Sequence, residues 1–139
     1  MRVFFDTNIL LDVVLKRDDK ALTDNAIKVL SAAKELGMER CVAAITIPTV
    51  AYVLKKMAPQ EKKALLAKLL EGLDILSSKA SHVESALKGG FNDIEDAMQY
   101  ACALENKCNL IITRDVHDYA PSRIPIMSPS QFLSGIGAD

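Results

Sequence analysis

Short apolar runs alternate with longer segments in which apolar residues recur every three or four positions. The short runs predict strands, and the longer segments predict amphipathic helices. The predicted strands are 2–5, 41–45, 73–76, 110–113 and 124–127. The predicted helices are 9–14, 23–35, 46–56, 59–72, 81–89 and 93–107, with a short helix near residue 130. Parallel strands joined by helices need right-handed crossovers, so we expect an α/β fold whose mainly parallel sheet is covered on both faces.

Helix boundaries carry signals of their own. Pro59 suits the first turn of a helix, and Gly37 suits the residue that follows the end of one. Ser81 and Glu84 have the spacing of a capping box, which predicts that a helix begins at Ser81. No linker, repeat or low-complexity stretch separates these elements.

The length and composition fit one globular domain over residues 1–139. Of the 139 residues, 50% are hydrophobic and 25% are charged, which are ordinary values for such a domain. No apolar run approaches the ~20 residues that span a bilayer, so we expect a cytoplasmic protein without a membrane partner. Cys41, Cys102 and Cys108 lack C-x-x-C spacing, and we expect reduced, mostly buried thiols.

Charge is distributed unevenly although the net charge is only −1. Residues 28–71 carry eight basic and four acidic groups, whereas residues 72–139 carry five basic and nine acidic groups. This asymmetry suits a cationic face beside an anionic pocket, which would grip a polyanion and act on it through a metal. A solvated helix surface accounts for the same counts without any ligand.

Acidic side chains follow two predicted strands and open the helix that leads into one of them. They are Asp6 after the first strand, Asp93 and Asp96 at the start of the helix 93–107, and Asp115 and Asp118 after the strand 110–113. Ligands bind outside the carboxyl ends of parallel strands, so we expect these acids to converge on one edge of the sheet. Their mutual repulsion favours a cation between them, and Mg²⁺ or Mn²⁺ with phosphodiester hydrolysis fits oxygen ligands best.

Each of these residues can also have a purely structural role. Asp6 and Asp93 can be helix caps, and Asp96 can be a favourable charge near the helix dipole. Asp115 and Asp118 can occupy turn positions, Thr113 can end a strand, and the Arg114 side chain can face solvent. The metal site is favoured by the joint placement of the acids, and by none of them alone.

Covalent or histidine-dependent catalysis has little support. His82 lies in the first turn of a predicted helix with no obvious partner, and His117 lies inside the turn that follows the strand 110–113. Ser81 and Cys102 belong to no recognisable catalytic triad.

Three stretches resemble the most diagnostic motifs of the PIN-domain ribonucleases, which include the VapC-like toxins. They are VFFDTNILLD at 3–12, DIEDA at 93–97 and IITRDVHDY at 111–119, in the family's order. The resemblance extends over essentially the whole chain. It implies a three-layer α/β/α sandwich with a central parallel sheet and an acidic pocket for Mg²⁺ or Mn²⁺. It also implies an endoribonuclease in which a metal-held water attacks the RNA phosphorus, and many small members are toxins restrained by a short antitoxin.

The resemblance assigns a role to each of the five acids named above and to two neighbouring polar residues. It implies that Asp6, Asp96 and Asp115 are the catalytic, metal-binding carboxylates, that Asn8 and Thr113 support them, and that Asp93 and Asp118 are accessory acids.

One position departs from the family's pattern. The family usually places a further acid, most often Glu, on the helix after the second strand, but residues 46–53 contain no carboxylate. Thr49 lies near the expected position. We therefore expect weaker metal affinity than in complete sites, with altered or lost activity as a consequence.

Lysines gather on the third and fourth predicted helices, which form an arm beside the active site in this family. The expected phosphate contacts are Lys55, Lys56, Lys62, Lys63 and Lys68, together with Arg114. Apolar residues of the same region, 65–66 and 69–70, face either the core or a second subunit of a homodimer.

Three hypotheses follow. The first is a metal-dependent endoribonuclease of the toxin type, with RNA as substrate and a short antitoxin as partner. The second is a catalytically weakened PIN protein that binds RNA or protein. The third is a metal-dependent phosphatase with an Asp nucleophile after the first strand, but such enzymes commonly require a second Asp where this chain has Asn8.

Overall fold

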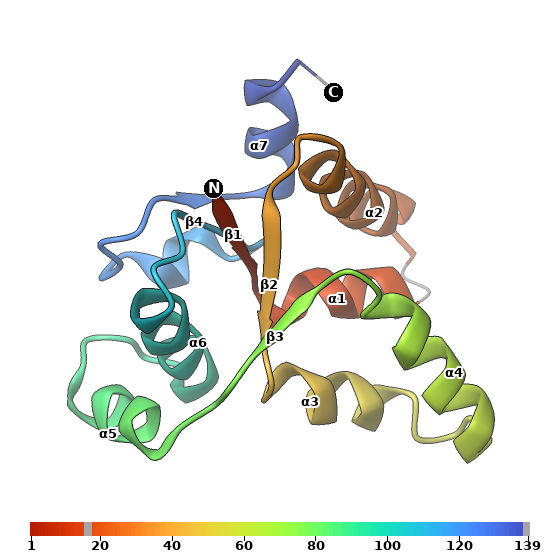
Figure 1. Ribbon diagram of the computed structural model, residues 1–139, viewed down its shortest axis with the longest axis horizontal. Coiled ribbons are helices and arrows are strands. Elements are labelled where there is room, and N and C mark those ends of the chain that lie inside the picture. Colours follow the sequence, from red (N-terminus) through yellow and green to blue (C-terminus); the bar gives the residue numbers. More distant parts are fainter. Residues whose placement is uncertain (16–17, 138–139) are drawn as a thin grey trace.

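A five-stranded parallel sheet forms the centre of the protein (Figure 1). The computed structural model describes residues 1–15 and 18–137. The strands are β1 (Arg2–Phe5), β2 (Glu39–Ala43), β3 (Asp74–Leu76), β4 (Leu110–Ile112) and β5 (Ile126–Met127), in the spatial order β3-β2-β1-β4-β5. This order places β1 at the centre. Because all four neighbouring pairs are parallel, the carboxyl end of β1 lies beside those of β2 and β4.

Helices connect the strands and cover the sheet. In the described part of the chain they are α1 (Thr7–Val14), α2 (Lys20–Glu35), α3 (Thr46–Val53), α4 (Pro59–Leu69), α5 (Ala80–Lys88), α6 (Ile94–Glu105), the 3-10 helix η1 (Val116–Tyr119) and α7 (Pro129–Gly135). Figure 1 shows α1 to α4 on one side of the sheet and α5 and α6 on the other. This arrangement is the three-layer α/β/α sandwich that the sequence predicts.

The central strand divides the hydrophobic core into two clusters. Val3 and Phe5 point to the face covered by α1, α2, α3 and α7, whereas Phe4 points to the face covered by α6 and η1. All three side chains are fully buried. Alternate side chains of a strand point to opposite faces, and a continuous apolar run is therefore what a strand covered on both sides requires.

The start of α5 differs from the prediction. The helix begins at Ala80, and its N-cap is Lys79, whose backbone N–H donates to Nδ1 of His82 at 3.2 Å. His82 is buried, and its Nε2 lies 3.1 Å from Glu105 Oε2 of α6. The capping box at Ser81 is therefore wrong, and so is the expectation that His82 lacks a partner. A buried ring that contacts a neighbouring helix determines this boundary, and local spacing does not reveal that contact.

The cysteines and the helix lengths agree with the sequence. Cys41, Cys102 and Cys108 are buried and form no disulfide, as predicted. Among the described helices, none has the length and apolar content needed to cross a bilayer.

Candidate active site

Asp6 and Thr113 lie side by side where two adjacent strands end. Phe5 of β1 pairs with Ile112 of β4, and the backbone N–H of Asp6 extends this pairing by donating to the Ile112 carbonyl at 3.0 Å. Asp6 is 3% exposed and Thr113 is fully buried. The parallel register therefore brings together two residues that are 107 positions apart.

The Asp6 carboxylate is held by three donors. Oδ2 accepts from Thr113 Oγ1 at 2.8 Å, and Oδ1 accepts from the Asn8 backbone N–H at 3.1 Å and from Gln99 Nε2 at 3.2 Å. Burial raises the pKa of Asp6, and these hydrogen bonds oppose the rise because they favour the charged form. Asp6 is thus the N-cap of α1 and also the centre of a network that joins β1, β4 and α6.

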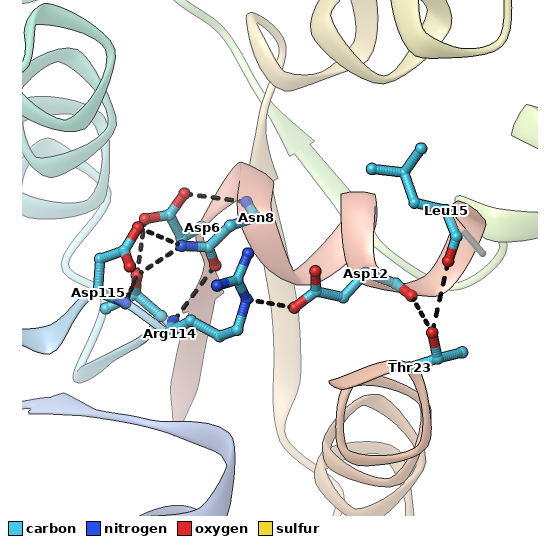
Figure 2. Close-up of polar contacts among 8 residues, drawn as sticks. Asp6, Asn8, Asp12, Leu15, Thr23, Arg114 and Asp115 are labelled. Atoms are coloured by element: carbon cyan, nitrogen blue, oxygen red, sulfur yellow. Dashed lines mark hydrogen bonds and ion pairs between the residues drawn. The ribbon is translucent and has the colours of Figure 1, made fainter. Parts of the chain in front are cut away.

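Asn8 connects this centre to Asp115 (Figure 2). Its Nδ2 lies 3.2 Å from Thr113 Oγ1 and 3.1 Å from Asp115 Oδ2, and its Oδ1 accepts from the Arg114 N–H at 3.3 Å. The side chains of Asn8 and Thr113 therefore contact carboxylates from two different segments, Asp115 and Asp6.

Asp93 and Asp96 open α6 beside the same edge. Asp93 is the N-cap, and its Oδ1 accepts from the Asp96 backbone N–H at 2.9 Å. Burial raises the pKa of Asp96 to about 7, and the negative charges of Asp6, Asp93, Asp118 and Asp115 contribute to the rise. The four other predicted acids thus lie close enough to Asp96 to raise its pKa, although the five come from three separate stretches of the chain.

These acids fit a hard divalent cation by their chemistry. As the side chains are placed, no three acids, histidines or cysteines of residues 1–15 and 18–137 lie close enough to share one ion. Their ligand atoms are nevertheless all oxygen, and the negative charges around Asp96 disfavour its ionisation. Asp6, Asp96 and Asp115 are the candidate residues that could hold Mg²⁺ or Mn²⁺.

Gln99 is a site residue that the sequence analysis missed. It is fully buried on α6, and its Oε1 accepts from the Thr7 backbone N–H at 2.9 Å while its Nε2 donates to Asp6. Thr7 Oγ1 lies 2.7 Å from Thr46 Oγ1, so the network also reaches α3. The signal in the sequence is spacing, because residue 99 follows Asp96 by three positions and shares its side of the helix.

A second missed contact joins α3 to the first turn of α6. Thr49 Oγ1 donates to Glu95 Oε1 at 2.9 Å, and both side chains are half-buried. Burial raises the pKa of Glu95, as do the charges of Asp6 and Asp93. A carboxylate therefore lies beside Thr49, although α3 itself carries none.

Tyr119 places a buried hydroxyl near the acids. It is 1% exposed and lies at the end of η1. Burial raises the pKa of its phenol, and the negative charges of Asp6 and Asp96 raise it further. The hydroxyl interacts with the Asp6 carboxylate closely enough to shift the pKa of both groups, although this contact does not have good hydrogen-bond geometry.

The Arg114 side chain forms an ion pair with Asp12 and does not simply face solvent. Its Nε lies 2.5 Å from Oδ2 of Asp12, a residue of α1 that is 1% exposed (Figure 2). Asp12 also anchors α2, because its carbonyl accepts from Thr23 Oγ1 at 2.8 Å. Arg114 therefore joins the loop after β4 to α1, and its predicted contact with RNA would be made by a cation that already has an anionic partner.

The predicted lysines lie on the α3–α4 side of the molecule. The helix predicted over 46–56 ends at Val53, so Lys55 and Lys56 lie in the segment between α3 and α4 and not on a helix. Lys55, Lys56, Lys63 and Lys68 are exposed, and Lys62 is half-buried. Lys55 Nζ lies 3.1 Å from the Tyr52 hydroxyl and 4.2 Å from the centre of its ring. The leucines of α4 are partly buried against the core cluster that includes α1 and α2, so they contribute to the core of this chain.

Known proteins provide an independent comparison. The sequence model of the PIN domain matches residues 2–117. The chain belongs to the PIN domain family. It is similar to Ribonuclease VapC1 of Aquifex aeolicus (strain VF5), with 30% identity over 139 residues that cover 94% of this chain and 92% of the relative.

Solved structures show the same PIN fold. VapBC2 from Rickettsia felis, bound to a DNA fragment from its promoter, contains a chain with a TM-score of 0.70 and 14% identity, which covers 92% of this chain and 98% of that one. A toxin–antitoxin complex from Klebsiella pneumoniae gives a TM-score of 0.66 and 24% identity, covering 91% and 97%. The PIN resemblance of the three motifs and the predicted fold class are thereby confirmed.

Proposed function

We propose that this PIN protein is a Mg²⁺- or Mn²⁺-dependent endoribonuclease of the VapC type and the toxin of a toxin–antitoxin pair. One observation carries the proposal. Asp6, Asp96 and Asp115 come from the end of β1, the start of α6 and the loop after β4, and their charges meet at one edge of the sheet. Repulsion among these carboxylates destabilises the metal-free protein. A cation bound among them would offset this repulsion.

Each of these residues contributes in a different way. Asp6 is fixed by Thr113, Gln99 and the start of α1, so its carboxylate is already oriented before any ligand binds. Asn8 orients Asp115. A bound Mg²⁺ or Mn²⁺ would lower the pKa of its water and neutralise charge on a phosphoryl oxygen. Side chains that are already oriented in this way lower the free energy needed to reorganise the site during the reaction.

RNA is the proposed substrate. The relative of this chain is a ribonuclease at 30% identity over nearly the full length of both proteins. The exposed lysines of α4 and of the segment between α3 and α4 supply a cationic surface that would attract a phosphate backbone without regard to sequence. A short antitoxin protein is the proposed partner, because similar chains occur in VapBC2 and in the Klebsiella pneumoniae toxin–antitoxin complex.

A cleavage assay with two variants tests the proposal. Purified protein is incubated with several RNAs and Mn²⁺, beside Asp96→Asn and beside Asp24→Asn, which removes one exposed carboxylate of α2. We expect cleavage by the unmodified protein and by Asp24→Asn, abolition by a chelator, and at least a hundredfold loss in Asp96→Asn. Equal cleavage by all three proteins would identify a contaminating nuclease and refute the assignment of this site.

The same assay decides between cleavage and simple binding. A catalytically weakened PIN protein would retain RNA in a filter-binding or gel-shift experiment and release no cleaved product with either metal. Hydrolysis of a generic aryl phosphate that depends on Asp6 would instead support the phosphatase hypothesis.

A further inference from the structure

A small pocket lies beside the acidic edge, the edge of the sheet where Asp6, Asp96 and Asp115 lie. Its volume is about 230 Å³, and it is enclosed by α2, the loop after β4 and the connection from β5 to α7. We call it the Arg114 pocket, and its lining residues are Leu22, Asn25, Arg114, Ser128, Pro129 and Ser130. Among these described residues none is acidic, so the pocket differs in charge from the neighbouring edge.

The order of the strands places this pocket at the carboxyl ends of β4 and β5. Ile112 of β4 pairs with Met127 of β5 in parallel register, so Arg114 and Ser128 follow neighbouring strands on the same side of the sheet. Arg114 directly precedes Asp115, and the Cα atoms of consecutive residues are ~3.8 Å apart. Ligands of parallel sheets bind at this side. A molecule bound at Asp115 can therefore extend into the Arg114 pocket.

A buried carboxylate orients the cation of the pocket. Arg114 Nε lies 2.5 Å from Asp12 Oδ2, and the Asp12 side chain is 1% exposed whereas that of Arg114 is 30% exposed. Figure 2 shows the side chains of two consecutive residues diverging, with Asp115 directed to Asn8 and Arg114 directed to Asp12. Within residues 1–15 and 18–137, Nε makes the only side-chain hydrogen bond of Arg114. The two terminal nitrogens of the guanidinium therefore remain for a ligand.

We propose that the Arg114 pocket binds an RNA backbone phosphate next to the phosphate that is cleaved. The proposal rests on the proposed function and specifies where the substrate lies beside the acidic edge. Arg114 supplies the positive charge, and Asn25 and Ser130 supply further hydrogen-bond donors. Side chains of these three types are usual donors to phosphate oxygens in nucleic-acid complexes. A guanidinium can also donate two parallel hydrogen bonds to one phosphate.

The size and the charge of the pocket both fit a single phosphate group. Its volume is below the ~300–1,000 Å³ of pockets that enclose a drug-sized ligand, so it accommodates one group of a longer molecule. A polyanion that reaches the acidic edge is repelled by the carboxylates there, and a fixed cation beside them offsets this repulsion. An anchored arginine also positions a phosphate more strictly than a flexible, exposed lysine does.

Binding of a short, fluorescently labelled single-stranded RNA tests the proposal. Fluorescence anisotropy is measured in chelator, so that no strand is cut. Ser130→Asp places a negative charge in the pocket and Ser130→Lys a positive one, and neither changes the Arg114–Asp12 ion pair. We expect Ser130→Asp to weaken RNA binding at least fivefold and Ser130→Lys to tighten it severalfold. Ser130 is exposed in the first turn of α7, where an acid favours the helix, so Ser130→Asp should fold.

Ser85→Asp and Ser85→Lys are the matched controls. Ser85 is an exposed residue of α5, on the other side of the sheet, and its variants make the same changes in net charge. Both should bind RNA within twofold of the unmodified protein. A general effect of net charge would instead change the affinity of the Ser85 variants as much as that of the Ser130 variants, and would refute the pocket.

Arg114→Gln tests the phosphate contact itself. Loss of one contact to single-stranded RNA should reduce the slope of log K against log salt by about 0.7. A role of Arg114 that is confined to its ion pair with Asp12 would lower stability and leave this slope unchanged. Urea unfolding of each variant shows that the proteins compared are folded.

The same measurements distinguish failure of the pocket from failure of the proposed function. If the unmodified protein binds and cleaves RNA, but either the Ser130 variants or Arg114→Gln behave like it, the role of the pocket is refuted and the proposed function stands. If the unmodified protein neither binds nor cleaves any RNA tested, the proposed function is refuted, and the role of the pocket with it.

Discussion

Gln99 Nε2 donates a hydrogen bond to Asp6 Oδ1 at 3.2 Å across 93 residues of sequence. The Oε1 atom of the same Gln99 amide accepts from the Thr7 backbone N–H at 2.9 Å. Both ends of one buried side chain therefore bind the turn that leads from β1 into α1. The amide has a single orientation that satisfies both contacts, which holds the Asp6 carboxylate in place relative to α6.

Gln99→Leu should destabilise the protein by about 2 kcal/mol, because it leaves the Thr7 N–H and one Asp6 contact unsatisfied in a buried place. The free energy of unfolding in urea measures the effect. Gln60→Leu, at an exposed position of α4, is the control and should change stability by less than about 0.5 kcal/mol. Equal stability of the two variants would show that the buried amide does not organise the site.

Asp96→Asn should make the stability of the metal-free protein less dependent on pH. The folded-state pKa of Asp96 is raised from 3.8 to about 7. A carboxyl with a raised folded-state pKa stabilises the fold fully below its unfolded pKa, and this contribution is lost as the pH rises through the folded pKa. Asparagine has no such loss, so the stability of the variant relative to the unmodified protein should rise between pH 4 and about 7. Thermal unfolding in chelator across this range measures the difference, and a difference independent of pH would contradict the prediction.

The ion pair between Arg114 and Asp12 should couple the loop after β4 to α1. The Asp12 carboxylate is 1% exposed, so solvent screens this ion pair less than it screens a surface pair. A double-mutant cycle with Arg114→Gln and Asp12→Asn should give a coupling energy of about 1–2 kcal/mol. The pair Arg2–Glu39, at 2.8 Å, is the control because its carboxylate is 61% exposed, and it should give less than about 1 kcal/mol. A smaller coupling energy for Arg114–Asp12 than for Arg2–Glu39 would refute this structural role.

The lysines of α4 and of the segment between α3 and α4 should control the salt dependence of RNA binding. Replacing Lys55, Lys56, Lys62 and Lys63 by Gln should weaken affinity and reduce the slope of log K against log salt by about 0.7 for each lost phosphate contact. Affinity for Mn²⁺ should not change. Lys28→Gln with Lys34→Gln, on α2, provides a control on the same side of the sheet. An unchanged slope in the fourfold variant would place the RNA surface elsewhere.

The sequence predicts every described strand to within a few residues because a sheet covered on both faces favours continuous apolar strands, as at Val3–Phe5. It also predicts the acidic edge, because parallel strands end on the same side of the sheet. The start of α5 could not be predicted, because it depends on the contact of buried His82 with Glu105.

The remaining contacts of the site depend on packing between distant elements. Gln99 and Glu95 are polar residues of α6. The spacing of Gln99 from Asp96 places the two residues on one side of the helix, but it does not show which side chain is buried. The partners of Gln99 and Glu95 are Asp6 and Thr49, which lie 93 and 46 residues away. The packing of α6 beside the end of β1 and beside α3 brings these pairs together, and local sequence carries no information on that packing.

The central claim is that Asp6, Asp96 and Asp115 hold one divalent cation. A crystal of the purified protein soaked in Mn²⁺, with the ion located by its anomalous scattering, tests this claim most directly. The account predicts a single strong peak among these three carboxylates, which disappears in crystals of Asp96→Asn. A peak at any other place, or none among these side chains at millimolar Mn²⁺, would contradict it.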